Sequence, residues 1–139
     1  MSLRLGPRIV AAIKRHGGDT YPYECCGALV GSTQENGDVE VVDVRPLDNV
    51  TSEGPRRRFL VSAQDYVASE SHARRAGLEL LGFYHSHPDH PAEPSQYDLD
   101  HAWPNFSYVI VAVAAGTPGD LRSWRLRPDR SQFDEETVS

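Results

Sequence analysis

One short segment of the chain places histidine, serine and aspartate at spacings that suit a metal site. His85 and His87 are separated by one residue, and Ser95 and Asp98 follow soon after. Alternate side chains of an extended strand share a face, so both imidazoles can point at one ion. Two imidazoles and one carboxylate are the usual three protein ligands of a catalytic zinc. The segment could therefore form a metal site, with His85, His87 and a carboxylate such as that of Asp98 as ligands.

The flanking residues indicate which elements carry this segment. Residues 79–84 read ELLGFY, which predicts a strand that enters the core. Three prolines, at positions 88, 91 and 94, then prevent a helix or a strand from continuing, so the chain must turn back over the strand end. Residues 95–98 have the S-x-x-D form of a helix start. Helix capping is therefore an alternative role for Ser95 and Asp98, and an H-x-H motif alone is a weak signal.

Together with an upstream glutamate, these residues resemble the signature of an enzyme family. The glutamate lies in the segment YPYECCGALVG. The residues that match are Glu24, His85, His87, Ser95 and Asp98. In this order and spacing they resemble the JAMM (MPN+, Mov34/PAD-1) zinc metallopeptidase motif at every position.

The resemblance extends roughly from Ile9 to Leu126. It is closest to the short prokaryotic members, because the segment WPNFSYVIV is similar to the strand lead-in of the small enzymes that process sulfur-carrier proteins. The resemblance implies a three-layer α/β fold related to the cytidine deaminases. The fold class expected is therefore α/β, with a mixed β-sheet flanked by helices.

The same resemblance implies a role for each matched residue. His85, His87 and Asp98 would hold the metal, Glu24 would act as general base and acid, and Ser95 would donate a hydrogen bond to the oxyanion.

Other titratable side chains lie close to the motif. Asp89 and Asp100 are rival carboxylates, and Asp98 is preferred because its offset from Ser95 matches the family. Two further histidines lie near the motif but off it, at His90 and His101.

The implied activity is hydrolysis of a peptide or isopeptide bond by a zinc metallopeptidase. Small bacterial members of the family act on ubiquitin-like, β-grasp sulfur-carrier proteins that end in Gly-Gly, and release cysteine or another adduct. An isopeptidase that removes ubiquitin-like modifiers from lysine is one alternative. A non-catalytic MPN scaffold is another, but silent members lose ligands that this chain retains. A zinc deaminase is set aside because its H-x-E and P-C-x-x-C motifs are absent.

Hydrophobic patterning predicts one domain over residues 1–139, with a core over 7–127 and a polar, acidic tail over 128–139, which is either frayed throughout or begins as the end of a strand. The expected element order is α-β-β-β-α-β-α-β-β. The expected helices cover residues 7–16, 62–75 and 95–102. The expected strands cover residues 25–30, 39–44, 59–61, 79–84, 107–115 and 121–126, with the last at the sheet edge.

Composition excludes several other classes. The net charge of −6 argues against sequence-independent nucleic-acid binding. No apolar run reaches membrane length and the N-terminus lacks a secretory signal, so we expect a cytoplasmic protein.

Two other short features have simple interpretations. The adjacent Cys25 and Cys26 are expected to pack on a buried strand. The run Arg56, Arg57 and Arg58 is interpreted as a solvated face, or as a flank of the substrate groove. The sequence does not indicate an oligomeric state.

Overall fold

The computed structural model describes residues 2–49, 51 and 60–139. Among these residues the strands are β1 (Ser2–Leu5), β2 (Cys26–Thr33), β3 (Val39–Leu47), β4 (Glu79–Pro88), β5 (Ser107–Ala114), β6 (Thr117–Leu126) and β7 (Phe133–Val138). The helices are α1 (Pro7–Thr20), α2 (Ala63–Arg75) and α3 (Gln96–His101). The expected strand over 59–61 is not formed at Leu60 and Val61, and residue 59 lies outside the described residues, as does the arginine run at 56–58.

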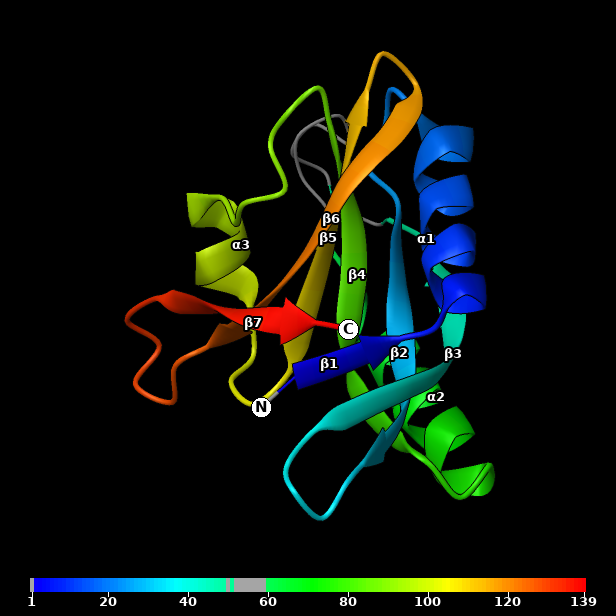
Figure 1. Cartoon of the computed structure of the whole chain (residues 1–139), viewed down its shortest axis with the longest axis vertical. Coiled ribbons are helices and arrows are strands. Elements are labelled where there is room, and N and C mark those ends of the chain that lie inside the picture. The colour runs from blue at the N-terminus through cyan, green and yellow to red at the C-terminus, as the bar shows by residue number, and fades with distance from the viewer. Residues whose placement is uncertain (1, 50, 52–59) are drawn as a thin grey trace.

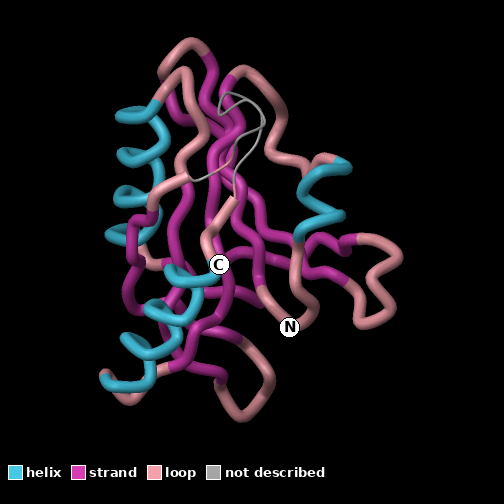
Figure 2. Tube along the Cα trace, turned by 180° about the vertical axis from the view of Figure 1, so that it is seen from behind, coloured by secondary structure: helices cyan, strands magenta, loops and turns pink. Residues whose placement is uncertain are grey.

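The strands form a closed barrel in the order β1-β3-β2-β4-β5-β6-β7. The three-layer sheet expected from the sequence is therefore wrong. The barrel closes where β7 pairs with β1 in parallel, with Ser2 opposite Thr137 and Leu3 opposite Val138. In Figure 1 these two strands lie side by side and bring the chain ends close together. Figure 2 shows the helices arranged around the outside of the strands.

Barrel closure was missed because both closing strands are weak sequence signals. β1 has only four residues, and β7 reads FDEETV, in which acidic residues occupy the centre. Instead of an acidic tail over 128–139, the structure places β7 over Phe133–Val138. β6 is consequently not an edge strand, because β7 pairs with it along four residues.

The strand with the histidines lies in the middle of the sheet. β4 pairs antiparallel with β2 and parallel with β5, and Cys26 of β2 lies opposite His85. Gly82 allows this close packing, because a Cβ atom there would lie 1.9 Å from the carbonyl oxygen of Ser107. The strand also runs beyond the residues 79–84 expected, to Pro88, so both histidines lie within it.

Successive side chains of β4 point to opposite faces of the sheet, and both faces are part of the core. Tyr84 packs in the cluster under α1, together with Ile9 and Ile13. Phe83 packs in a second cluster with Val61, which precedes α2, and with other residues on its own side of the sheet. His85 and His87 occupy alternate positions along the strand after Phe83, so their side chains lie on the same face as Phe83, away from α1.

Helix α1 is longer than the residues 7–16 expected. Gly17 and Gly18 continue the helix to Thr20 instead of ending it. A Cβ atom at Gly17 would lie 3.1 Å from a methyl group of Val113, so the glycine lets the helix approach β5 closely. None of the helices in the described part of the chain is long and apolar enough to cross a membrane.

Candidate metal centre

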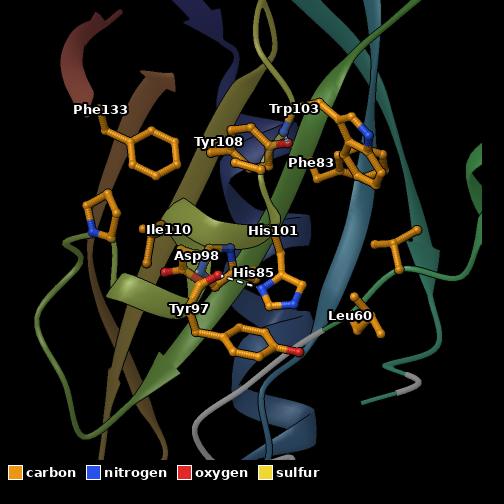
Figure 3. A pocket seen from close by; sticks show the side chains of 13 residues that line it. Leu60, Phe83, His85, Tyr97, Asp98, His101, Trp103, Tyr108, Ile110 and Phe133 are labelled. Carbon is orange, nitrogen blue, oxygen red and sulfur yellow. Dashed lines mark hydrogen bonds and ion pairs between the residues drawn. The ribbon is translucent and has the colours of Figure 1, made fainter. Parts of the chain in front are cut away.

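Three buried side chains from β4 and α3 meet at one point. The Nε2 atoms of His85 and His87 lie 3.1 Å apart, and each lies 3.3 Å from Oδ2 of Asp98. Tetrahedral zinc with bonds of about 2.0–2.1 Å requires ligand atoms separated by roughly 3.3–3.4 Å. The three atoms therefore already have nearly the spacing that one zinc ion would impose. His85 and Asp98 are labelled close together near the centre of Figure 3.

The imidazole of His87 is held with its Nε2 free to bind a metal. Its Nδ1 lies 2.8 Å from the carbonyl oxygen of Pro91. A carbonyl oxygen only accepts hydrogen bonds, so Nδ1 must carry the hydrogen and the lone pair of the neutral ring lies on Nε2. A main-chain carbonyl that orients a ligand histidine is a common feature of metal sites. The sequence shows the proline turn but gives no signal for this contact.

Asp98 also caps helix α3. Its Oδ2 accepts a hydrogen bond from the N–H of Ser95 at 2.9 Å, while Oγ of Ser95 accepts one from the N–H of Asp98 at 3.1 Å. This is the capping box that S-x-x-D predicted. Because Oδ2 is also the atom that faces the two histidines, the same carboxylate could both cap the helix and bind a metal.

Burial and charge set the protonation of this cluster. Burial lowers the pKa of His85, which favours the neutral ring that a metal requires. Burial also acts to lower the pKa of His87, but the contact with Asp98 outweighs it and the pKa of His87 is raised. Burial alone would raise the pKa of Asp98, but His85, His87 and the Ser95 N–H together hold that pKa well below its usual range. Asp98 is therefore ionised at neutral pH.

Glu24 reaches the same cluster from a distant part of the sequence. One ligand atom from each of Glu24, His85 and His87 lies within 4.8 Å of the others, and Glu24 is only 4% exposed. Pairing of Cys26 with His85 explains this convergence, because Glu24 lies just before β2. These three residues form a group that could hold a metal, and Asp98 adds a second carboxylate to it.

Two clefts give access to Glu24. One is lined by Glu24, His87, His90, Pro91, Glu93, Pro94 and Ser95. The other lies between the end of α1 and the end of β3, and is lined by residues that include Tyr21, Tyr23 and Asp48. Glu24 lines both, so it is the residue at which the two clefts meet.

An apolar pocket borders the histidine and aspartate on another side (Figure 3). His85 and Asp98 form part of its wall. Its aromatic lining comes from Phe83, Tyr97, Trp103, Tyr108 and Phe133. Apolar walls strengthen electrostatic interactions by excluding water, so this pocket suits a site that must bind a cation tightly. The sequence did not identify these residues as part of the site, because aromatic residues in strands indicate only a core.

The rival carboxylates do not join the cluster. Asp89 accepts hydrogen bonds from Oη of Tyr21 at 2.6 Å and from the N–H of Ala115 at 2.8 Å. Asp100 is exposed and accepts a hydrogen bond from Nε2 of Gln96.

The two additional histidines also lie outside the group of ligand atoms. His101 is exposed, and its Nδ1 donates to the carbonyl oxygen of Tyr97. His90 lines the first cleft, with its ring centre 6.4 Å from that of His87.

Both cysteines are buried beside Glu24, and we expect them to be unreactive in the folded protein. Burial raises the pKa of Cys25 to about 11 and that of Cys26 to about 12. At pH 8 both groups are therefore thiols, which are poor nucleophiles. Iodoacetamide should modify neither cysteine in native protein and both in denaturant, as read by intact-mass spectrometry. Rapid labelling of the native protein at pH 8 would contradict the buried positions.

Comparison with known proteins shows the family. The family model described as prokaryotic homologs of the JAB domain (Prok-JAB) matches residues 7–127. The chain belongs to this family, as the JAMM/MPN resemblance of its sequence implied.

Two curated relatives are informative. Desampylase from Haloferax volcanii is 34% identical over 92 residues, which cover 66% of this chain and 63% of that protein. A probable TtuB-protein conjugate cleaving protease from Thermus thermophilus is 39% identical over 74 residues, which cover 53% of this chain and 49% of that protein. The match thus spans less than two thirds of the length of either relative.

Solved structures share the whole fold. A protein from Salinibacter ruber is 45% identical, with a TM-score of 0.77 over 99% of this chain and 90% of that one. A JAB1/MPN domain protein from Archaeoglobus fulgidus is 17% identical, with a TM-score of 0.56 over 100% of this chain and 96% of that one. The second likeness concerns the fold alone.

Proposed function

We propose that this protein is a zinc metallopeptidase that hydrolyses the bond after the C-terminal Gly-Gly of a ubiquitin-like sulfur-carrier protein and releases cysteine. The observation that carries the proposal is the set of three ligand atoms 3.1–3.3 Å apart, with the buried Glu24 beside them. The relatives support the substrate class, because one is named a desampylase and the other a TtuB-conjugate cleaving protease.

His85, His87 and Asp98 are the residues that would hold the zinc. Two imidazoles and a carboxylate suit Zn²⁺ better than Mg²⁺ or Ca²⁺, which prefer oxygen ligands throughout. Bound zinc would lower the pKa of water to roughly 7 and polarise the scissile carbonyl group.

Glu24 is the proposed general base and acid. It would take a proton from the attacking water as the water oxygen bonds to the carbonyl carbon, and return that proton to the leaving nitrogen as the C–N bond breaks. Glu24 lines two clefts through which a substrate could reach it.

Ser95 is the proposed oxyanion donor. Its Oγ already accepts the N–H of Asp98, which leaves the hydroxyl hydrogen available to donate. Ser95 also lines the cleft beside Glu24. A single donor of this kind contributes about 3 kcal/mol to the transition state in other hydrolases.

The test compares two conjugates of one carrier. One carries a cysteine after its C-terminal Gly-Gly, and the other is linked through Gly-Gly to a lysine side chain. We expect zinc-loaded protein to release cysteine from the first. Cleavage of the lysine conjugate alone would make the protein an isopeptidase, the second candidate, which the name of the Thermus relative favours. If protein that retains zinc cleaves neither conjugate, the proposed hydrolase activity is wrong.

A further inference from the structure

The peptide group that follows Glu24 is held on both edges by side chains from other segments. Its carbonyl oxygen, on Glu24, accepts a hydrogen bond from Nδ2 of Asn49 at 3.3 Å. Its N–H, on Cys25, donates to Oγ of Ser86 at 2.8 Å. We propose that Asn49 and Ser86 form a clamp that positions the Glu24 carboxylate over the histidines. Both are positioning residues, because they act on Glu24 through its backbone.

Ser86 links the base directly to the strand that carries the ligands. It lies between His85 and His87 on β4, with its side chain on the opposite face and fully buried. Its own N–H donates to the carbonyl oxygen of Cys25 at 3.2 Å. In a regular antiparallel pair the Cys25 N–H would return to a main-chain carbonyl, but here it bonds the serine hydroxyl. The chain therefore leaves the ladder at this residue, where Glu24 must turn toward the metal site.

The orientation of Asn49 is fixed by its other hydrogen bonds. Its Oδ1 accepts the N–H of Leu60 at 3.0 Å and that of Thr51 at 3.2 Å. An amide oxygen must face these donors, so the NH₂ group is directed at the carbonyl oxygen of Glu24. Asn49 thus connects the backbone of Glu24 to that of Thr51 and Leu60.

The clamp matters because Glu24 and Cys25 precede β2 rather than lying within it. The side-chain contacts of Asn49 and Ser86 add order where the strand has not yet begun. A reacting group displaced by about 1 Å can cost roughly 100-fold in rate. The kinetic part of this inference rests on the proposed function, in which Glu24 transfers the proton.

The kinetic test uses Ser86→Ala and Asn49→Ala. Each should lower kcat about 100-fold and change the zinc Kd by less than about threefold, because neither residue belongs to the group of ligand atoms. In Ser86→Ala the KM should also change by less than about threefold, because Ser86 is fully buried. Ser86→Thr retains Oγ and should restore most of kcat. Ser123→Ala is the matched control, since it removes an equally buried hydroxyl, on β6, that bonds Glu136.

A double-mutant cycle separates positioning from general damage. In the Glu24→Gln background, Ser86→Ala should cost less than about threefold, because the group that it positions has already lost its function. An equal loss in both backgrounds, or loss of zinc by Ser86→Ala, would overturn the clamp.

A second measurement does not depend on turnover. In zinc-loaded protein, NMR should show the Cys25 amide exchanging about tenfold faster in Ser86→Ala, the change expected for one typical hydrogen bond. The carboxyl carbon resonance of Glu24 should move in both Ser86→Ala and Asn49→Ala, but not in Ser123→Ala. If the wild type cleaves neither conjugate, the proposed function fails, and these two signals alone decide the clamp. Unchanged signals in both variants would refute it.

Discussion

Glu24→Gln is expected to bind zinc as tightly as the wild type and to lose between about 100-fold and 10,000-fold in kcat, the range that general acid–base catalysis contributes. The amide has nearly the shape of the carboxylate but cannot take a proton from water. The metal should stay, because the three atoms at 3.1–3.3 Å belong to His85, His87 and Asp98. Zinc content after dialysis and single-turnover cleavage of the Gly-Gly conjugate measure the two effects separately.

Glu93→Gln is the matched control for this prediction. Glu93 is an exposed acid that lines the same cleft and pairs with Arg122 at 3.2 Å. It lies outside the cluster of ligand atoms, so its amide should keep both zinc and nearly full activity. Two results would contradict the assignment of Glu24. Full activity of Glu24→Gln would show that it is not the base, and loss of zinc would make it a ligand.

The local part of the site could be predicted because it follows from short-range geometry. Strand alternation places His85 and His87 on one face, and S-x-x-D places Ser95 and Asp98 at a helix start. Neither argument requires knowledge of the rest of the fold. The helix and strand types were also largely predictable, because the periodicity of 107–115 or 62–75 is a property of the segment itself.

The closed barrel could not be predicted in this way. It depends on pairing between the two ends of the chain, where Leu3 meets Val138. β1 is too short and β7 too acidic at its centre to be a clear strand signal, and each is held by pairing with its neighbours, β3 and β7 for β1 and β6 and β1 for β7. The same limit applies to Gly17, which looks like a helix end until Val113 of β5 is placed beside it.

Glu24 is intermediate between the local site residues, which could be predicted, and the barrel closure, which could not. Its sequence neighbours gave no chemical role, and only the family resemblance connected it to the histidines. The physical cause is the β2–β4 register, which sets Cys26 opposite His85 and leaves Glu24 at the mouth of the site. Register is set by the packing of whole strands, so no single residue near Glu24 could have revealed it. The hydrogen bond that Asn49 donates to Glu24 and the one that Ser86 accepts from Cys25 could not be predicted for the same reason.

His85→Ala is expected to lose both zinc and activity. His85 is 1% exposed, and its Nε2 contacts both His87 and Asp98. Its removal leaves two of the three proposed ligands, and zinc affinity should fall by more than about 100-fold, beyond what the loss of an outer-shell partner costs. Zinc affinity is measured by competition with a chromogenic chelator, and cleavage of the conjugate should fall to background.

A thermal-melting experiment separates loss of the metal from loss of the fold. A ligand that binds only the folded state raises Tm, so zinc should raise the Tm of the wild type but not that of His85→Ala. His90→Ala is the matched control, because His90 lines the cleft outside the cluster and its variant should keep the zinc-dependent rise. If His85→Ala retained one zinc per chain and the same rise in Tm, the metal would be bound elsewhere. The close contact of His85, His87 and Asp98 would then reflect packing and helix capping alone.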